Sequence, residues 1–537
     1  MAEIPLIVEE LSFRYRDRSG AAIQNISFEA QPGEILLIAG ASGCGKTTLI
    51  RCINGLIPRS YKGDLSGRVL LFGKDTAGLR LSQISQTIGT VLQDPERQIL
   101  GTKVLNEVAF GLENLGLPRD EILSRVDEAL RFLKISHLRE RETFNLSGGE
   151  KQKVALAGVL AMRPSILLLD EPLASLDPAS AQDTLEAVRR LADEGLTVLL
   201  VEHRVEDVLR IRPDRVMFMA DGRIRYLGDV TGLSRVVDYR QVKLPADAIV
   251  ERARLDPPPA EMKVLPTVAG SEPGGEALVK FENVAFGYDE REVLHGINLE
   301  IKRGDVIAVL GPNGAGKTTF VKHAIGLLKP KSGRVLVNGR DTREASVAEI
   351  ASTLGYVFQS PSHMLFAPTV YEELAFGPTN LNHPKEQIAK EVRGALQIVN
   401  LADKEKDPPL ALSFGQQKRV SIAAILAMRS RILVMDEPTA GQDYQNYMNF
   451  MDAIMQMPGF EAILFITHDV DLAVIYANRV LMIADGRVVA DGAPQDVLRD
   501  FDRLEANRLV PTSLLALNLE RFPQTGRFLR AEALAHF

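Results

Sequence analysis

The sequence of 537 residues predicts an α/β protein built from two tandem copies of one domain, each with a mostly parallel sheet as its core. Two observations support this fold class. Short runs of aliphatic and β-branched residues alternate with longer helical segments, a pattern typical of parallel sheets. The same pattern then returns in the second half of the chain, which indicates a duplicated domain.

The duplication is clearest in three motifs. GASGCGKT at residues 40–47 returns as GPNGAGKT at 311–318, 271 residues later. ILLLDEP at 166–172 returns as ILVMDEP at 432–438, and VLNEVAFG at 104–111 returns as VYEELAFG at 370–377, both 266 residues later. The difference of five residues fits a short insertion in the first half, near residues 59–64.

The expected elements of each half follow in order. A buried-strand candidate, residues 35–39 or 306–310, leads directly into the glycine-rich loop. A second apolar pair, residues 196–201 and 462–466, predicts another buried strand. Apolar residues at helical spacing predict the same amphipathic helix in both halves: Ile122, Val126, Leu130 and Leu133, then Ile388, Val392, Leu396 and Val399.

These matches divide the chain into a first domain at residues 1–235 and a second at 277–500. The segment between them, 236–276, is rich in proline and lacks strong periodicity, so it is predicted to be a linker that could hold short ordered pieces. Residues 501–537 have no counterpart between the halves and are predicted to be a C-terminal extension.

Composition excludes several classes of protein. The 63 Lys and Arg against 70 Asp and Glu give a net charge of −7, which argues against a generally basic nucleic-acid binder. The two cysteines exclude a disulfide framework and favour a reducing compartment. No apolar stretch approaches the roughly 20 residues of a membrane-spanning helix, and the acidic N-terminus does not resemble a secretory signal. The chain is therefore expected in the cytoplasm, with membrane contact only through partner proteins.

The glycine-rich loops predict phosphate binding, because such loops aim backbone N–H groups at the phosphates. Lys46 and Lys317 are expected to reach the β- and γ-phosphates, and Thr47 and Thr318 to offer a hydroxyl to Mg²⁺. The predicted nucleotide-binding residues of the loops are Gly40, Ala41, Ser42, Gly43, Cys44, Gly45, Lys46, Thr47 and Thr48, and Gly311, Pro312, Asn313, Gly314, Ala315, Gly316, Lys317, Thr318 and Thr319.

An acidic pair ends an apolar run in each half, at Asp170 with Glu171 and at Asp436 with Glu437. The aspartates suit Mg²⁺ coordination, directly or through water. The adjacent glutamates suit activation of the attacking water. The pairing of each acidic motif with a phosphate loop favours this functional interpretation over that of a solvated strand end.

The segment LSGGEKQKV at 146–154 resembles the signature of ATP-binding cassette (ABC) ATPases. The resemblance covers roughly residues 5–235 and 278–500. It implies two tandem P-loop NTPase domains, each with a helical subdomain and a small antiparallel β part. It also implies roles for Gln93 and Gln359 as Q-loop glutamines that touch Mg²⁺ and water, for His203 and His468 as switch histidines, and for Tyr15 and Tyr288 as adenine-stacking aromatics. SLD at 175–177 and GQD at 441–443 resemble D-loops.

The family mechanism implies composite ATP sites shared between the two cassettes. One would join the loop 40–47 to Ser413 and Gly415, and the other the loop 311–318 to Ser147 and Gly149. The second signature reads LSFGQQ, with Phe414 in place of a glycine, so we predict a slower but live first site. Cys44 is either a reactive thiol at a helix N-terminus or a small residue that fits the loop, and Cys52 is expected in the core.

The type of ABC protein is indicated by residues after the first Q-loop. QDPERQ at 93–98 and EVAFGLENLGLP at 107–118 resemble the ATPases of energy-coupling factor (ECF) transporters, which take up vitamins, their precursors and metal ions. The second half keeps ELAFGPTN at 373–380 but has QSPSHM at 359–364.

The ECF resemblance implies a transmembrane coupling (T) component and a substrate-capture (S) component as partners, no nucleic acid, and a place on the cytoplasmic side of the cell membrane. Two alternatives remain open. They are a fused sugar-importer ATPase and a soluble two-cassette ribosome-associated ATPase.

Overall fold

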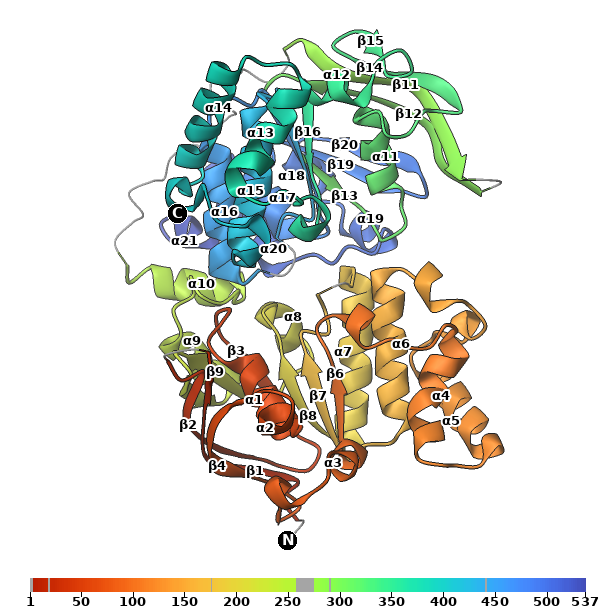
Figure 1. The fold of residues 1–537 in the computed structure, drawn as a ribbon, viewed down its shortest axis with the longest axis vertical. Helices are drawn as coiled ribbons and strands as arrows, with labels where there is room; N and C mark the ends of the chain where they lie inside the picture. The colour runs from red at the N-terminus through yellow and green to blue at the C-terminus, as the bar shows by residue number, and fades with distance from the viewer. Residues whose placement is uncertain (1–2, 18–19, 175, 257–274, 289–290, 440–441) are drawn as a thin grey trace. The chain divides into compact units, whose positions relative to one another are not determined.

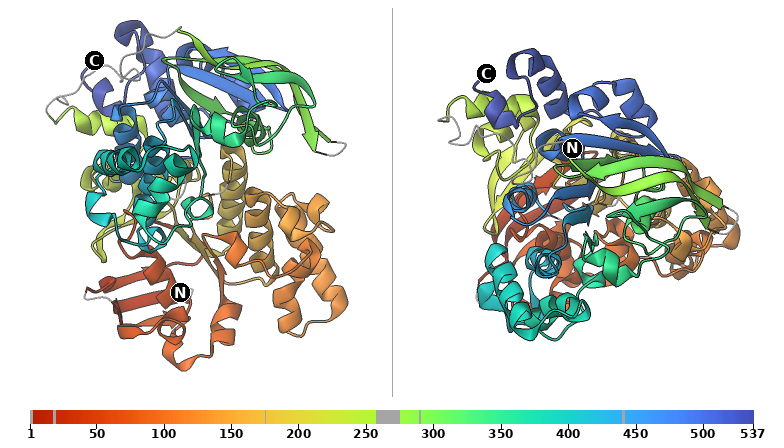
Figure 2. Two further views of the ribbon diagram at one scale, coloured as in Figure 1. Left: turned by 45° about the horizontal axis from the view of Figure 1, so that its top comes forward. Right: turned by 90° about the horizontal axis from the view of Figure 1, so that it is seen from above.

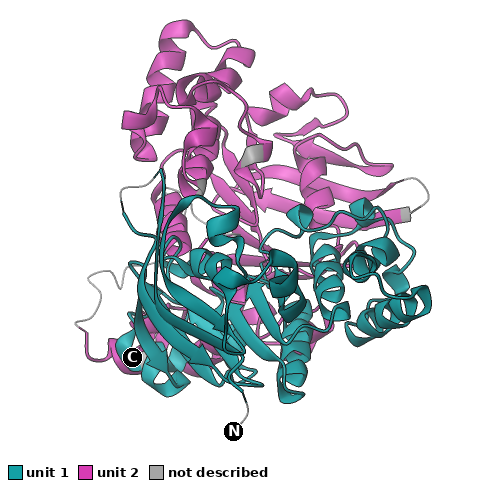
Figure 3. Cartoon of the chain, turned by 60° about the horizontal axis from the view of Figure 1, so that its bottom comes forward, with its two compact units in different colours: residues 1–249, 443–445 teal, residues 250–442, 446–537 magenta. Residues whose placement is uncertain are grey.

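The computed structural model describes residues 3–17, 20–174, 176–256, 275–288, 291–439 and 442–537. The chain forms two compact units, drawn as ribbons in Figures 1 and 2 and coloured by unit in Figure 3. The first comprises residues 1–249 with 443–445, and the second 250–442 with 446–537. Within the predicted linker, helix α10 (Ala246–Ala253) is formed, and residues 257–274 lie outside the described part of the chain.

The first unit contains a six-stranded sheet in the order β10-β9-β3-β8-β7-β6. All its pairs are parallel except β9 with β10. Strands β3, β7 and β8 are buried along their whole length, as expected for a parallel sheet that is covered on both faces. The strands are β3 (Ile35–Ala39), β6 (Ile88–Val91), β7 (Ile166–Asp170), β8 (Thr197–Val201), β9 (Arg215–Ala220) and β10 (Arg223–Gly228).

An antiparallel sheet of the first unit, in the order β2-β1-β4-β5, packs its apolar face with the parallel sheet into one core. Its strands are β1 (Leu6–Tyr15), β2 (Ile23–Ala30), β4 (Gly63–Leu71) and β5 (Lys74–Asp75). Helix α1 (Lys46–Ile53) contributes Leu49, Ile50 and Ile53 to the same core.

A helical part of the first unit lies on the other side of the parallel sheet from these antiparallel strands (Figures 1 and 2). It consists of α4 (Val104–Asn114), α5 (Arg119–Phe132) and α6 (Gly148–Ala161). The other helices of this unit are α2 (Leu56–Arg59), α3 (Leu81–Thr87), α7 (Pro178–Asp193), α8 (Val205–Leu209) and α9 (Val230–Val236). Helix α2 lies in the region where the repeat spacing predicts the insertion.

The second unit repeats this architecture, with sheets in the orders β16-β17-β18-β13-β19-β20 and β12-β11-β14-β15. Its strands are β11 (Ala277–Tyr288), β12 (Arg291–Lys302), β13 (Val306–Leu310), β14 (Ser332–Val337), β15 (Arg340–Asp341), β16 (Leu354–Val357), β17 (Ile432–Asp436), β18 (Ala462–Ile466), β19 (Arg479–Ala484) and β20 (Arg487–Gly492). Its helices before the extension are α11 (Lys317–Ala324), α12 (Val347–Ala351), α13 (Val370–Asn380), α14 (Lys385–Ile398), α15 (Phe414–Ala427), α16 (Tyr444–Gln456), α17 (Val470–Tyr476) and α18 (Pro494–Val497).

The C-terminal extension forms α19 (Phe501–Ala506), α20 (Ser513–Thr525) and α21 (Ala531–Leu534). It is tied to the second unit by polar contacts. The Thr512 hydroxyl bonds to Asp471, and Arg530 pairs with Asp452 while also donating to the Tyr476 hydroxyl at 3.0 Å.

The predicted α/β fold with two tandem cassettes is confirmed. Each cassette has the mostly parallel sheet, the antiparallel part and the helical part that the sequence predicts. In the part of the chain that the structure describes, none of the helices combines the length and apolar character needed to cross a membrane.

Candidate nucleotide-binding sites

The first glycine-rich loop joins the end of β3 to the start of α1, which begins at Lys46. Gly40 has φ 148°, and a Cβ there would lie 2.3 Å from the Met219 carbonyl oxygen. Glycine is therefore required at this position. The ammonium group of Lys46 donates to the carbonyl oxygens of Gly40 at 2.7 Å and Ala41 at 2.9 Å. The loop thus curls around the lysine side chain at the helix N-terminus, the place where anions are favoured.

The second loop has the same geometry. Gly311 has φ 145°, and a Cβ there would lie 2.0 Å from the Ile483 carbonyl oxygen. Lys317 begins α11 and donates to the carbonyl oxygens of Gly311 at 2.7 Å and Pro312 at 2.9 Å. The two units therefore contain two equivalent phosphate loops.

Asp170, the last residue of β7, lies beside the first phosphate loop. The Thr47 hydroxyl donates to its Oδ1 at 3.4 Å. Burial raises the pKa of Asp170 to about 6, and the nearby charge of Glu171 adds to this rise. The threonine and the aspartate that the sequence predicts as Mg²⁺ ligands are thus in hydrogen-bond contact, and the role itself stays a prediction.

Glu171 is held from two sides. Its Oε1 lies 2.9 Å from His203 Nε2, and Gln93 Nε2 donates to its Oε2 at 2.6 Å. Burial tends to raise the pKa of this carboxyl, but the hydrogen bond and charge of His203, with the charge of Lys46, outweigh it and leave the pKa below its usual range. Glu171 is therefore a carboxylate at neutral pH, as a general base must be.

Both glutamates of the acidic pairs have left-handed backbone conformations, with φ 52° at Glu171 and 46° at Glu437. Such values are uncommon for residues other than glycine and cluster at functional sites. The repetition in both units points to a shared requirement of the site.

The acidic pair of the second unit is held differently. Asp436 accepts hydrogen bonds at Oδ2 from the Thr318 hydroxyl at 3.1 Å and from the Tyr356 hydroxyl at 2.8 Å. His468 Nδ1 lies 2.9 Å from Glu437 Oε1. Gln359, which the sequence predicts as the second Q-loop glutamine, is exposed and makes no such bond to Glu437 within the described residues. The structure therefore joins Gln93, but not Gln359, to its glutamate.

The predicted adenine-stacking tyrosines lie in different surroundings. Tyr15 is half-buried, with its hydroxyl 3.2 Å from Thr48 Oγ1 and 3.2 Å from the Arg51 guanidinium, both on α1. Tyr288 is 47% exposed and lies edge-on to Phe286. Adenine stacking stays a prediction for both residues.

The predicted signature serines begin helices. Ser147 caps α6 and Ser413 caps α15, each in a capping box with the side chain three residues on. Phe414 is the first residue of α15, where the right-handed helical backbone suits any residue, so replacing glycine causes no backbone strain here. Gly149 and Gly415 follow in the first turn. Ser175 and Gly441 of the predicted D-loops lie outside the described residues.

The two cysteines are both buried and free. Cys44 Sγ lies 3.9 Å from Lys46 Nζ, yet burial dominates and raises the pKa of the thiol. This favours a residue that fits the loop over a reactive thiol. Cys52 belongs to the apolar core of the first unit.

Three buried residues of these sites escape sequence reasoning. Burial raises the pKa of Glu202, which precedes His203, to about 7, with a contribution from the charge of Glu171. Burial lowers the pKa of Lys418 to about 7, and its ammonium donates to the Pro438 carbonyl oxygen at 2.6 Å. Tyr356 reaches Asp436 as described. The sequence held only weak signals for two of them. Glu202 is a charged residue directly after an apolar run, and Lys418 stands where the first half has Gln152.

Oxygen donors at the two loops suit Mg²⁺, a hard cation that takes oxygen ligands. In each unit a threonine hydroxyl and an aspartate carboxylate are already in hydrogen-bond contact, Thr47 with Asp170 and Thr318 with Asp436. Elsewhere in the described ranges, no group of three or more His, Cys, Asp or Glu side chains is placed to hold a metal ion.

A strand that leads into a glycine-rich loop, a lysine at the start of the next helix and an acidic pair on a neighbouring strand define the P-loop nucleoside triphosphatases. The family model described as "ABC transporter" matches residues 23–174 and 294–440. The chain belongs to the ABC transporter family, and its two cassettes are ATP-binding ATPase domains.

Similar proteins extend along nearly the whole chain. A protein of Streptococcus pneumoniae serotype 4 is 38% identical over 536 residues, covering 96% of both chains. One from Methanosarcina mazei is 36% identical over 550 residues, covering 96% of this chain and 93% of its own. Both carry the provisional name ABC transporter ATP-binding protein. A solved structure, CbiO1 from Clostridium perfringens, part of the ABC transporter complex CbiONQ, is 34% identical and covers 47% of this chain and 97% of its own, with a TM-score of 0.40.

Proposed function

We propose that this chain is the ATP-hydrolysing energy-coupling subunit of an ECF-type importer. It powers the uptake of a vitamin, a vitamin precursor or a metal ion through separate membrane proteins. The observation that carries this proposal is a set of large apolar side chains exposed at matched positions in both units. The resemblance of residues 93–98 and 107–118 to ECF ATPases supports it.

In the first unit the exposed residues are Leu100, Phe110 and Phe144, and their counterparts 266 residues later are Phe366, Phe376 and Leu410. Their exposed fractions run from 47% to 71%. Single exposed apolar residues are ordinary, but a set that recurs in two units indicates a binding surface. We call these two sets the apolar patches.

Buried polar contacts hold the first patch together. The Glu107 carboxylate on α4 accepts the backbone N–H groups of Leu100 at 2.8 Å and Gly101 at 2.6 Å. The Thr143 hydroxyl donates to the Gly101 carbonyl oxygen at 2.6 Å. Leu100 is therefore fixed next to the segment that carries Phe144, and Phe110 follows Glu107 on the same helix.

The second patch repeats the glutamate contact. Glu373 on α13 accepts the N–H groups of Phe366 and Ala367, both at 2.8 Å. The rings of Phe366 and Phe376 meet edge-on with centroids 4.8 Å apart. Each patch lies in the stretch between the Q-loop and the signature, so a partner bound there can sense the state of Gln93 or Gln359. This placement suits coupling of hydrolysis to a membrane protein.

The chemistry expected at each phosphate loop uses residues already in place. Glu171 and Glu437 accept the proton of the attacking water, and His203 and His468 orient these carboxylates. Lys46 and Lys317 bind the phosphates. Thr47 with Asp170, and Thr318 with Asp436, would hold a Mg²⁺ ion, which would neutralise charge on the phosphates. Gln93 is placed to position the water through its bond to Glu171.

The test is purification of the tagged chain from gently solubilised membranes, followed by identification of the bound proteins. We expect a multi-span coupling protein and a small integral membrane protein. A Phe110→Asp, Phe144→Asp variant should lose both, while Leu255→Asp, which changes an exposed leucine outside the patches, should keep them. Recovery of ribosomes without a membrane partner would contradict the proposal and favour the ribosome-associated alternative. Recovery of sugar-importer membrane subunits would favour the alternative that the chain is a fused sugar-importer ATPase.

A further inference from the structure

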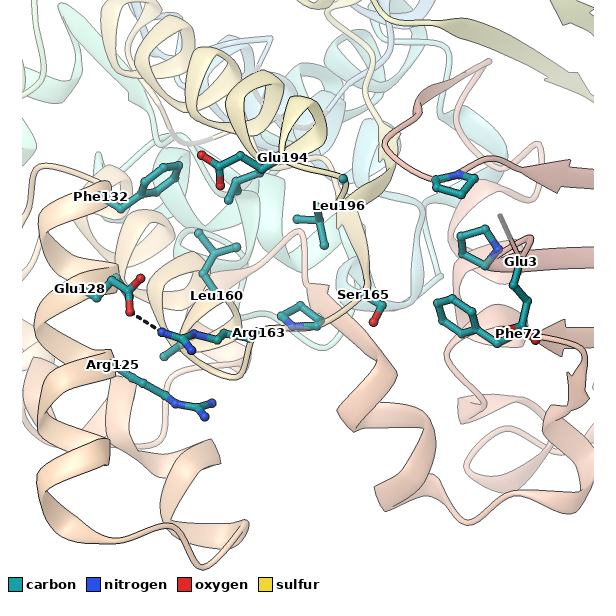
Figure 4. Close-up of a pocket in the computed structure, with 17 residues that line it drawn as sticks. Glu3, Phe72, Arg125, Glu128, Phe132, Leu160, Arg163, Ser165, Glu194 and Leu196 are labelled. Atoms are coloured by element: carbon teal, nitrogen blue, oxygen red, sulfur yellow. Dashed lines mark hydrogen bonds and ion pairs between the residues drawn. The ribbon is translucent and has the colours of Figure 1, made fainter. Parts of the chain in front are cut away.

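A pocket of about 760 Å³ opens in the first unit, away from its phosphate loop (Figure 4). Its lining includes Pro32, Ser165 and Leu196, which lie just before β3, β7 and β8. The pocket is therefore at the amino ends of the parallel strands. The phosphate loop follows the carboxyl end of β3, so the two sites lie at opposite edges of the sheet.

Apolar side chains line two walls of this pocket. Phe132 and Leu160 come from the helical part, on α5 and α6, and Phe72 comes from the turn after β4. Figure 4 shows Phe72 across the opening from Phe132 and Leu160, with Leu196 between them. A flat apolar body fits between such walls, as in most small-molecule sites.

At the matched place the second unit has an ion network. Arg431 donates to both carboxylate oxygens of Glu461, at 2.9 and 2.7 Å, and to Asn338 Oδ1 at 3.0 Å. Arg303 pairs with Glu461 at 3.0 Å. Each of these four residues has its counterpart in the lining of the first pocket.

The first unit has replaced all four network residues. The positions of Arg303, Asn338, Arg431 and Glu461 are occupied in the first unit by Pro32, Phe72, Ser165 and Leu196, in that order. None of these four side chains can form an ion pair. Where the second unit has a polar network, the first unit thus has a mostly apolar hollow on the same fold.

A second exchange places two arginines on the helical wall. In the second unit Glu391 pairs with Arg429 at 2.9 Å. In the first unit Arg125 occupies the position of Glu391, beside Arg163 at the position of Arg429. Two guanidinium groups therefore stand where the second unit has one acid–base pair. Each pairs with a glutamate that the second unit lacks, since Glu121 and Glu128 occupy the positions of Gln387 and Gly394. Guanidinium groups bind carboxylate, sulfonate and phosphate groups with paired hydrogen bonds.

The two arginines have partners of their own but retain donors. Arg163 pairs with Glu128 at 2.8 Å, and Arg125 pairs with Glu121. The Arg125 Nε is buried and has no hydrogen-bond partner. The remaining acids of the lining, Glu3 and Glu194, come from the N-terminal segment and the end of α7, not from the wall with the arginines.

We propose that this pocket binds an amphipathic small molecule with a flat apolar body and one anionic group. The body packs between Phe72 and the Phe132–Leu160 wall, and the anionic group meets Arg125 and Arg163. The residues that line the site come from the first unit. The site stands independently of the transporter proposal, because no residue of the nucleotide sites or apolar patches takes part in it.

The test uses 8-anilinonaphthalene-1-sulfonate, a flat aromatic sulfonate whose fluorescence rises on binding. It is titrated into the full-length chain with saturating ADP and Mg²⁺ to block the nucleotide sites. One saturable equivalent is expected. Arg125→Glu, which restores the acid of the second unit, should weaken binding about tenfold or more because a charge-assisted contact is lost.

A variant designed to close the pocket provides a second test of dye binding. The Phe72→Asn, Ser165→Arg, Leu196→Glu variant installs the residues of the second unit and should abolish the saturable signal. Should it fold poorly, Leu196→Glu alone tests the same point. Unchanged ATPase activity in each variant shows that the fold is intact. Equal binding by the wild type and the closed variant would overturn the pocket as the site. Equal binding of the uncharged N-phenyl-1-naphthylamine, with no effect of Arg125→Glu, would overturn the preference for an anion.

Discussion

The Tyr356 hydroxyl donates to Asp436 at 2.8 Å, and the first unit lacks this contact because Thr90 stands at the matched position. Thr90 Oγ1 instead accepts a hydrogen bond from Asn54 at 3.4 Å. The two phosphate loops thus have near-identical geometry, but the acidic pairs beside them have different hydrogen-bond partners. The two ATP sites are therefore chemically distinct even before their signatures are compared.

Tyr356→Phe should lower the turnover of the second site, because Asp436 loses the group that orients it. A buried hydrogen bond contributes roughly 1 kcal/mol, or about a fivefold change in rate. The measurement is ATPase activity against Mg²⁺ concentration in a Glu171→Gln background, and the Mg²⁺ requirement should rise. Thr90→Val in a Glu437→Gln background is the matched control and should change little. An unchanged Mg²⁺ dependence in Tyr356→Phe would show that the contact is only structural.

Glu171→Gln and Glu437→Gln, made separately, should each reduce ATP turnover, since each removes the proton acceptor of one site. Loss of a general base costs about 10²–10⁴-fold at the affected site. We expect Glu437→Gln to cause the larger loss in total turnover, because the family resemblance assigns Phe414 to the signature of the first site and so predicts that this site is slower. If Glu171→Gln changed nothing while Glu437→Gln abolished turnover, the first site would be inactive rather than slow.

The family resemblance predicts composite ATP sites, each formed by the phosphate loop of one unit and the signature of the other. A substitution in one signature should then reduce ATP binding at the phosphate loop of the other unit. Ser147→Arg should reduce ATP labelling of the peptide that contains Lys317 and spare the peptide that contains Lys46. Ser413→Arg should do the reverse. The measurement is photolabelling with an azido-ATP followed by mass spectrometry of the peptides. Labelling lost within the same unit as the substitution would argue against shared sites.

Glu202→Gln should alter the pH dependence of stability. Burial, with the charge of Glu171, raises the pKa of Glu202 from 4.5 to about 7. Between these values the folded chain binds more protons at Glu202 than the unfolded chain, so the free energy of unfolding falls as pH rises. Glu202→Gln has no carboxyl to titrate, so its free energy of unfolding does not fall for this reason. Between pH 5 and 7.5 the free energy of unfolding of the variant should therefore rise by up to about 3 kcal/mol relative to that of the wild type.

Calorimetric melting at several pH values measures this difference between variant and wild type. Thr467 occupies the matched place in the second unit, so Thr467→Ser should leave the pH dependence of melting unchanged. A constant difference between Glu202→Gln and the wild type from pH 5 to 7.5 would refute the prediction.

Much of the fold was predictable from the chain alone. The strands β3 and β13 have the predicted bounds, because five consecutive aliphatic residues before a glycine-rich loop can be buried only as a central strand. The helices α5 and α14 follow from their apolar spacing. The threonines of the loops and the aspartates of the acidic pairs lie together in both units. Their roles at the nucleotide stay predictions, which rest on residue type at fixed spacing.

Other features depended on contacts between residues far apart in the chain. Tyr356 meets Asp436 across 80 positions, and no local pattern distinguishes a tyrosine that donates to a carboxylate from one that packs in a core. Lys418 looks like an ordinary surface lysine until the helix α15 is packed over the turn that contains Pro438. The bond of Gln93 to Glu171, without an equivalent at Gln359, is likewise visible only in three dimensions.

The sequence by itself determined that this protein is a duplicated α/β ATPase, because phosphate binding demands glycines, a lysine and carboxylates in a set order. Only the tertiary structure decided how the two copies differ. The hollow at Phe72 and Leu196, and the ion network at Asn338 and Glu461, arise from side chains that come together at the end of a sheet from separate segments. Burial and pairing there depend on distances in space, which the order of residues does not record.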